Sequence, residues 1–239
     1  GGVAPGEIVT VLGSAMGPPE LTPLRVTGQG RLDTTLAGAR ILFNGVPAPL
    51  LYVSEQRSSA IVPYDVAGRP SVDVQVEYQG IRSDAVRIPV LANRPGIFTF
   101  DSSGKGQAAI VNEDGSVNSP SNPAPPGSVV AIYATGGGAT DPPGVDGVIV
   151  GGPLPRLKSR VAVAISNNII AYPEVDGGSE DYRYYAQILY AGGVPGSVAG
   201  LVQINARVPA GVPPGSAVPL HIITDWSKIE QSLTIAIGP

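Results

Sequence analysis

Few side chains in this sequence could carry out chemistry, and none has the partners that chemistry requires. The chain has one histidine, His221, and no cysteine, which excludes thiolate metal sites and thiol nucleophiles. His221 falls on a strand predicted from Val218 to Ile223, and no serine lies in the Gly-x-Ser-x-Gly pattern of a nucleophile elbow. We interpret His221 as structural, predict no catalytic residue, and expect that the protein is not an enzyme.

Three consecutive glycines, Gly136 to Gly138, follow a strand predicted from Val129 to Thr135 and superficially resemble a phosphate-binding loop. Such a loop needs a following helix whose N-terminus faces the phosphate. The residues that come next, DPPGVDG, are unsuited to begin a helix. We therefore interpret the glycines as an ordinary loop and predict no cofactor.

Acidic residues gather in three regions and could supply oxygen ligands for calcium or paired carboxylates for glycoside hydrolysis. They are Glu113 and Asp114, Asp141 and Asp146, and Asp176, Glu180 and Asp181. None shows the spacing of an EF-hand or of a repeated acidic nonapeptide. We interpret them as turn and loop residues and predict no metal site, since Asp favours turns.

The aromatic residues give the strongest indication of a binding surface in this sequence. Tyr182, Tyr184, Tyr185 and Tyr190 lie in DYRYYAQILY, and Trp226 lies at a predicted hairpin tip. Tyr and Trp are enriched where proteins meet proteins or sugars. Tyr182, Tyr184 and Trp226 are therefore candidates for contact with a glycan or another subunit. The alternative is that strand alternation simply turns Tyr185 toward the core and Tyr184 outward.

The elements that must position these residues are short strands. Gly and Pro number 32 and 25 of 239 residues, which disfavours long helices. Alternation of apolar and polar residues between turn signals predicts strands in the first half. They cover Glu7 to Leu12, Arg40 to Phe43, Leu50 to Val53, Ser59 to Val62, Ser71 to Tyr78 and Ala85 to Val90.

The second half of the sequence repeats the first. Pro5-Gly6 before IVTVLGSAMGP corresponds to Pro126-Gly127 before VVAIYATGGGATDP, and Val62-Pro63 corresponds to Val208-Pro209. The offset only grows along the chain, which indicates one ancestral unit with later loop insertions. About seven short strands in a repeat of roughly 100 residues are typical of an immunoglobulin-like sandwich. We therefore predict an all-β fold of two tandem immunoglobulin-like β-sandwiches related by internal duplication.

The repeat also predicts domain boundaries. We place the first sandwich at residues 1–98 and the second at residues 124–239, with a loop insertion at about 142–181. Residues 99–123 are predicted to form an ordered hairpin connector that packs on the second sandwich. Its turn is Asn112-Glu113-Asp114-Gly115, where Asp-Gly suits a tight hairpin.

Each repeat resembles the TIG-type immunoglobulin-like module, with its Pro-Gly turn, a strand that ends in glycine, the segment FNGVPAP and a terminal hairpin. The segments PGIFTFDSSGKGQAAIVNEDG, from Pro95, and ILYAGGVPGSVAGLVQINARVPAGVPPG, from Ile188, are similar to the Solibacter-type C-terminal domain family of secreted acidobacterial proteins. This resemblance covers nearly the whole chain. It implies export and an extracellular or cell-surface location, and it offers no catalytic residues.

The start of the sequence departs from that family. Its members usually carry a short apolar strand before the APGE turn, whereas only Gly1-Gly2-Val3 precede Ala4 here. We therefore expect an unpaired sheet edge, a possible assembly edge at Gly1, Gly2, Val3, Ala4 and Pro5, which would invite a strand from a neighbour. The absence of an initiator Met and of a charged leader is interpreted as a processed, secreted chain.

Charge and hydropathy limit the partners. Fifteen Lys and Arg against 19 Asp and Glu give a net charge of −4, and no basic cluster is present, so nucleic-acid binding is not expected. No apolar run reaches the ~18 residues that span a bilayer, so no transmembrane segment is predicted. Only 14% of residues are charged, which favours close contact with other surfaces.

These features predict an extracellular structural protein. We expect a subunit whose partner is itself, a homopolymer that forms a surface fibre, tube or layer through strand-edge and apolar contacts. The alternative is a secreted carbohydrate-binding or adhesion module that contacts cell-surface glycans through Trp226 and the cluster from Tyr182 to Tyr190.

Overall fold

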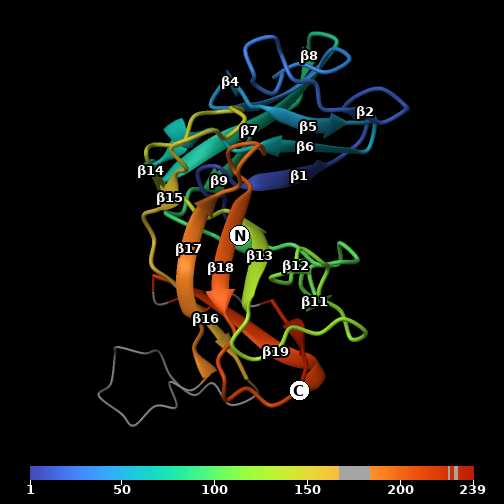
Figure 1. Ribbon diagram of the computed structural model, residues 1–239. Coiled ribbons are helices and arrows are strands. Elements are labelled where there is room, and N and C mark those ends of the chain that lie inside the picture. Colours follow the sequence, from blue (N-terminus) through green and yellow to red (C-terminus); the bar gives the residue numbers. More distant parts are fainter. Residues whose placement is uncertain (167–183, 226, 229–230) are drawn as a thin grey trace. The chain divides into compact units, whose positions relative to one another are not determined.

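The computed structural model describes residues 1–166, 184–225, 227–228 and 231–239 (Figure 1). Strands form nearly all of the regular structure in these residues, and the prediction of an all-β fold is confirmed. The one helix found there is a single 3-10 turn, η1 (Tyr64–Val66), so nothing helical in the described part has the length and apolar character to cross a membrane.

The chain divides into two compact units, each built from three segments. Unit 1 comprises Gly1–Arg94, Thr135–Lys158 and Gly192–Val202, and unit 2 comprises Pro95–Ala134, Ser159–Ala191 and Gln203–Pro239. This division differs from the predicted boundaries at residues 98 and 124. The reason is that residues 135–158 and 192–202, predicted to belong to the second sandwich, pack with the first.

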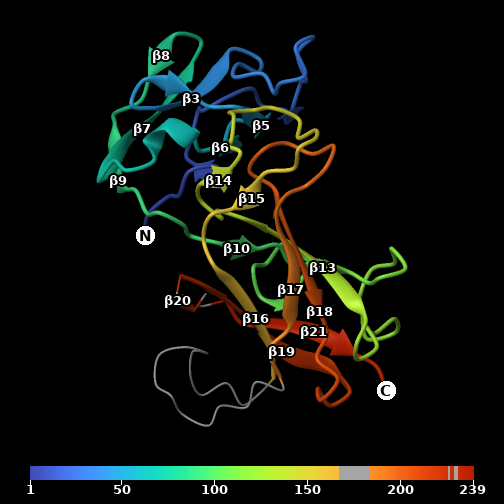
Figure 2. The ribbon, with the colours of Figure 1, turned by 60° about the vertical axis from the view of Figure 1, so that its left-hand side comes forward.

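Unit 1 contains two antiparallel sheets (Figures 1 and 2). The first has the strand order β1-β6-β5-β2, with β1 (Ile8–Leu12), β2 (Thr22–Pro23), β5 (Leu50–Val53) and β6 (Arg57–Ile61). The second has the order β4-β3-β7-β8, with β4 (Val46–Pro47), β3 (Ala39–Phe43), β7 (Ser71–Tyr78) and β8 (Ile81–Arg82), and β9 (Val86–Pro89) also pairs with β7. The returning segments add the pair β14 (Thr140–Asp141) and β15 (Arg156–Leu157).

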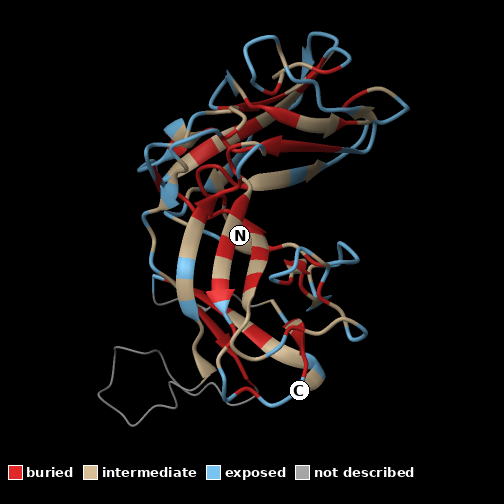
Figure 3. Ribbon diagram, viewed as in Figure 1, coloured by how far each residue is buried: buried red, intermediate tan, exposed pale blue. Residues whose placement is uncertain are grey.

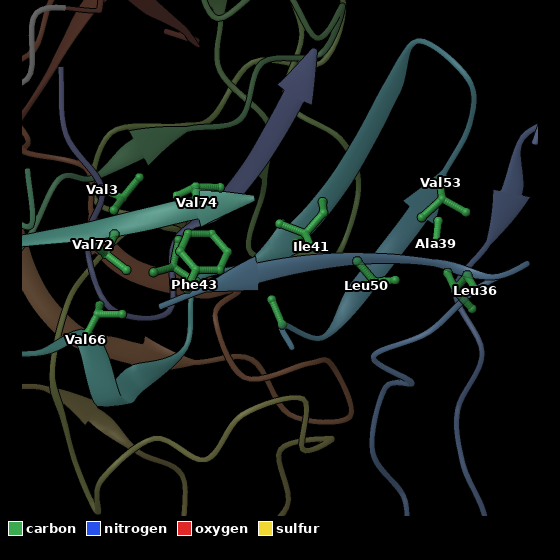
Figure 4. Close-up of a cluster of buried hydrophobic side chains, with 13 residues drawn as sticks. Val3, Leu36, Ala39, Ile41, Phe43, Leu50, Val53, Val66, Val72 and Val74 are labelled. Atoms are coloured by element: carbon green, nitrogen blue, oxygen red, sulfur yellow. The ribbon is translucent and has the colours of Figure 1, made fainter. Parts of the chain in front are cut away.

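The core of unit 1 lies between these two sheets. Alternation along β7 buries Val72 and Val74, which belong to the same buried cluster as Phe43 of β3 and Leu50 of β5 (Figure 4). Val9 and Val11 of β1 pack against this cluster from the edge of the first sheet. Burial of each large side chain contributes about 1.5–3 kcal/mol, so this double layer is the main stabilising feature of the unit.

Unit 2 is also built from two sheets. One contains β10 (Gly96–Ile97), β13 (Val129–Thr135), β18 (Val202–Arg207) and β17 (Gln187–Gly193) in that order, and β12 (Ile110–Val111) pairs with β13. The other has the order β11-β21-β19-β16, formed by β11 (Gly106–Gln107), β21 (Leu233–Ile237), β19 (Gly215–Thr224) and β16 (Val161–Ile165), with β20 (Ser227–Lys228) also on β19. Residues 99–123 therefore lie within unit 2.

The two units share a strand topology. The order β1-β6-β5 in unit 1 matches β13-β18-β17 in unit 2, and β3-β7-β9 matches β16-β19-β21. The starting turns also match, because the N–H of Gly6 donates to Val62 and that of Gly127 donates to Val208, each at 2.9 Å. Both glycines have positive φ, at 70° and 84°. This agreement is what an internal duplication would produce, and the duplication itself stays a prediction.

Candidate functional site

The N-terminal segment is paired, contrary to the sequence prediction. Val3 donates its N–H to the Pro89 carbonyl and accepts from the Leu91 N–H, each at 2.9 Å, in a parallel bridge with Val90. Val3, Ala4 and Pro5 are buried, Gly2 is half-buried and only Gly1 is exposed. The prediction that Gly1 to Pro5 form an unpaired edge is therefore wrong, because the chain just after β9 stays extended and Val90 bridges Val3.

The open edge of the first sheet in unit 1 is β1 itself. The Gly13 N–H donates to Gln56 and the Val62 N–H to Glu7, so in this antiparallel register the odd-numbered residues of β1 direct their backbone groups toward β6. The groups of Ile8, Thr10 and Leu12 consequently face the other way. The Ile8 N–H donates to Oγ1 of Thr135 at 2.7 Å. No backbone partner pairs with Thr10 or Leu12 on that side among the described residues.

β1 differs from the other edge strands of unit 1 in carrying no protective residue. β2, β4 and β9 each contain a proline, at Pro23, Pro47 and Pro89, and β8 contains Arg82. Proline and charge on an edge strand block pairing with another chain. The β1 sequence IVTVL has neither, and Figure 3 draws β1 as intermediate to exposed beside the buried β6. Leu12 is 76% exposed.

An ion pair between the buried Glu7 and the exposed Arg94 holds the chain at the start of β1. Glu7 is 6% exposed; its Oε2 accepts the Ala4 N–H at 2.7 Å, and its Oε1 accepts Nη1 of Arg94 at 2.9 Å. Burial raises the pKa of Glu7, and the Ala4 N–H and Arg94 oppose this rise. Each carboxylate oxygen therefore binds a group of the chain itself, and Glu7 positions the entry into β1.

The triple glycine has a packing role. A Cβ on Gly136 would lie 2.2 Å from the Arg94 carbonyl oxygen, and one on Gly138 would lie 2.1 Å from that of Ala92. Both glycines have positive φ, and the Arg94 N–H donates to the Gly136 carbonyl at 2.8 Å. The glycines thus let two backbone segments of unit 1 touch, which agrees with the interpretation of this stretch as a loop.

Tyr64 is clamped between two other glycines of unit 1. A Cβ on Gly144 would lie 2.3 Å from Cζ of the ring, and one on Gly6 would lie 2.6 Å from the same atom. The Tyr64 N–H donates to Oδ1 of Asp146 at 2.8 Å. Burial, with a smaller contribution from the Asp146 charge, raises the pKa of Tyr64 from its ordinary value of 10 to about 12.

Next to this clamp lies a pocket of about 170 Å³. All of its lining residues belong to unit 1, and none carries a charged side chain. Glycine, proline and aliphatic side chains dominate the lining, which also includes Tyr64 and Thr140. The Thr140 hydroxyl is already used, because it donates to the Pro142 carbonyl at 2.8 Å. A pocket of this kind suits an uncharged, apolar group.

The predicted aromatic site is described only in part. Tyr182 and Trp226 lie outside the described residues. Tyr184, Tyr185 and Tyr190 are each half-buried, and Tyr185 forms a bridge with Ala164 of β16. The role of Tyr182, Tyr184 and Trp226 in glycan or subunit contact therefore stays a prediction.

The remaining candidates have structural positions. His221 is half-buried on β19 opposite Ala164. The Asp114 carboxylate accepts the Ser116 N–H at 2.9 Å within a turn, and Glu113 accepts the Val129 N–H at 3.1 Å. Within the described ranges, no three His, Cys, Asp or Glu residues are grouped as a metal site would require, and Asp176, Glu180 and Asp181 lie beyond those ranges.

Sequence reasoning missed both the β1 edge and the pocket. The sequence did contain a signal for the open β1 edge. The other edge strands of unit 1 contain proline or a charged residue, whereas IVTVL contains neither and is the one long apolar strand of the unit with an open side. For the pocket, the sequence offered only the high frequency of Gly and Pro in residues 136–155, which does not identify a cavity. No protein-family model matches the sequence, and no curated protein does.

Proposed function

We propose that the protein is an extracellular structural subunit that associates with copies of itself through the open edge of β1. The observation that carries the proposal is the contrast between β1 and the proline- or charge-bearing edges of the same unit. An extracellular location is what the family resemblance of the two segments from Pro95 and Ile188 implies.

The chemistry of β1 favours a second copy as its partner. When two β1 strands pair antiparallel about Thr10, threonine faces threonine and Ile8 faces Leu12, with no charge brought against its own kind. The outward groups form about four backbone hydrogen bonds, two between the Thr10 residues and two from Leu12 to Ile8. Each contributes roughly 1 kcal/mol net.

This contact is weak by itself. About 4 kcal/mol from hydrogen bonds only matches the lower estimates of the cost of association. Affinity therefore depends on the apolar side chains of β1 that face away from the core, the half-buried Ile8 and the exposed Leu12. A two-fold contact also closes on itself and produces a dimer. A fibre, tube or layer therefore requires a second, different contact.

Proline at Thr10 tests the proposal. Because the Thr10 N–H faces away from β6, Thr10→Pro keeps the bonds within the sheet but removes the central donor of the paired edges. We expect sedimentation velocity to give a dimerisation constant lowered roughly 30-fold, the equivalent of two lost hydrogen bonds. Thr10→Val, which retains the N–H, is the matched control and should associate like the parent.

Circular dichroism must give the same spectrum for all three proteins, so that loss of association is not loss of fold. Electron microscopy of concentrated parent protein should reveal ordered polymers. Parent protein that stays monomeric at every concentration, or Thr10→Pro that associates as strongly as Thr10→Val, would contradict the proposal.

A further inference from the structure

The side of β1 that is open in unit 1 is covered at the matching strand of unit 2. Beside β18, β13 occupies the place that β1 occupies beside β6. Counted from the matching Pro-Gly turns, Thr10 corresponds to Ala131, which pairs antiparallel with β12. Leu12 corresponds to Tyr133, whose N–H donates to the Ala109 carbonyl at 3.2 Å. The backbone groups that lie open on β1 are therefore bonded on β13.

The strand β9 matches β21 in the same way. A parallel bridge lies at Val90, just after β9, and another lies at Ile237, in β21. Counted back from these bridges, Val86 corresponds to Leu233. Leu233 is 4% exposed, whereas Val86 is 61% exposed. The end of β9 that is bare in unit 1 is therefore covered in unit 2.

One extended stretch of unit 2 provides both covers. The Gly106 N–H donates to the Ser232 carbonyl at 2.7 Å. The Ala108 N–H donates to the Thr234 carbonyl at 3.0 Å, in the region where β11 runs parallel to β21. Residues 106–111 thus bond to one sheet through their first half and to the other sheet through their second half, which contains β12.

The same stretch completes the core of unit 2. Ile110 is 1% exposed, and the side chains of Val130 and Ile132 on β13 are 0% exposed. The corresponding side chains of unit 1, Val9 and Val11, are only half-buried. Unit 1 therefore has room along this side for an apolar strand of the kind that unit 2 contains.

The strand β9 offers the hydrogen-bond acceptors that such a strand needs. The Val90 N–H donates to the Pro70 carbonyl, so the even-numbered residues here direct their backbone groups toward β7. The carbonyls of Ala85 and Arg87 face the other way, and neither has a partner among the residues that the structure describes. They match the two carbonyls that are bonded in unit 2. Pro89 does not prevent this contact, because proline removes a donor and leaves the carbonyls of the strand available.

We propose that the open side of unit 1, between β1 and β9, binds an extended apolar segment of a different protein as unit 2 holds residues 106–111. The segment runs antiparallel to β1 and parallel to β9, and its apolar side chains at alternate positions face the core. About five backbone hydrogen bonds hold it, two at Thr10, one at Leu12 and one each at the carbonyls of Ala85 and Arg87. The inference rests on the β1 edge of the proposed function and names a competing partner for that edge.

The two apolar segments of this chain that fit the pattern are not free for this role. Residues 106–111 are engaged within unit 2. The β1 strand of a second copy directs its odd-numbered backbone groups to its own β6, so it can bond to β1 but not also to β9. A separate segment closes both sheets, and it adds burial of Val86 and of its own apolar side chains to the hydrogen bonds. This additional burial is what pairing of two β1 strands lacks.

The probe for this site is a synthetic peptide with the sequence of residues 105–112, KGQAAIVN. Fluorescence anisotropy of the labelled peptide should show saturable binding to the parent protein. A peptide of the same composition in shuffled order is the control and should not bind. Amide hydrogen exchange at Thr10 and Leu12 should slow when the peptide is bound, because both N–H groups gain a partner. Excess peptide should also lower the dimerisation of the parent protein in sedimentation velocity.

A charge on the β9 side separates this contact from β1 pairing. Val86→Asp places a carboxylate where the segment buries an apolar side chain, so peptide affinity should fall about 10- to 100-fold. The dimerisation constant should stay that of the parent, because β1 is unchanged. Ile81→Asp puts the same charge at a 78% exposed position on β8 and is the matched control, expected to bind the peptide like the parent. Both changes are at exposed side chains, and circular dichroism should give the parent spectrum for each.

Three results would overturn the inference: no binding of the peptide to parent protein, equal binding by Val86→Asp and Ile81→Asp, or binding that leaves exchange at Leu12 unchanged. Each of these results leaves self-association through β1 intact. Parent protein that binds the peptide but stays monomeric at every concentration would instead refute self-association and support the strand-binding side of unit 1.

Discussion

Replacing Gly136 by alanine is expected to lower the free energy of unfolding of unit 1 by more than the positive φ of Gly136 alone would explain. The new Cβ would stand 2.2 Å from the Arg94 carbonyl oxygen, whereas real Cβ contacts essentially never fall below 3.0 Å. The two segments must therefore separate by at least 0.8 Å, and this movement also disturbs the 2.8 Å hydrogen bond from the Arg94 N–H to Gly136.

The magnitude follows from two contributions. A positive φ costs an alanine about 1 kcal/mol relative to glycine, and overpacking of this kind costs about 1–3 kcal/mol more. Gly45 has φ of 80° and open space around its Cβ, so Gly45→Ala isolates the first contribution within the same unit. We expect about 1 kcal/mol for Gly45→Ala and about 2–4 kcal/mol for Gly136→Ala.

The free energies of unfolding are to be measured in urea by far-ultraviolet circular dichroism. Amide hydrogen exchange should assign the loss of protection in Gly136→Ala to residues of unit 1, including those around Arg94. If Gly136→Ala costs no more than Gly45→Ala, the close backbone contact is not a source of stability and the packing role assigned to the triple glycine is refuted.

Two further predictions concern buried polar groups. Burial raises the pKa of the Asp146 carboxyl, so the folded protein binds the carboxyl proton more tightly than the unfolded chain does. The contribution of Asp146 to stability therefore falls as the pH rises from the ordinary pKa of 3.8 to the raised value. Asp146→Asn, which keeps an acceptor for the Tyr64 N–H, should therefore shift the melting temperature upward relative to parent more at pH 7 than at pH 3; a shift that is the same at both would contradict this. Asn118 is 1% exposed and pairs with both the N–H and the carbonyl of Ala236, each at 2.9 Å, so Asn118→Ala should cost about 2–4 kcal/mol in urea unfolding. The exposed Ser121→Ala should stay within about 0.5 kcal/mol of parent, and equal effects of the two changes would argue against the Asn118 network.

The strands could be predicted because their signal is local. The predicted ranges Leu50 to Val53 and Ser71 to Tyr78 coincide with β5 and β7, and the other predicted strands of the first half differ from the observed ones by one or two residues at their ends. Period-two alternation between Gly and Pro turns is enough to place such strands, since each side chain faces either the core or water.

The arrangement of the site could not be predicted in the same way. The fit of Gly136 against Arg94, or of Tyr64 between Gly6 and Gly144, depends on the absence of a Cβ at a distant backbone contact. Glycine also occurs in many ordinary turns, so its presence in the sequence does not show which glycine lies against a distant backbone or side chain. The pairing of Val3 with Pro89 and Leu91 likewise depends on the path of the chain after β9, which alternation does not specify.

The threading of the chain through its two units has a consequence for biosynthesis. Unit 1 receives its last segment only at Gly192–Val202, so a nascent polypeptide cannot complete this body until most of unit 2 has also emerged. Until Thr135–Lys158 has emerged, the backbone at Arg94 and Ala92 that receives Gly136 and Gly138 stays uncovered, while the unprotected edge of β1 is already present. Premature aggregation is the hazard of that interval, and a chaperone that holds the incomplete chain apart from other copies would counter it.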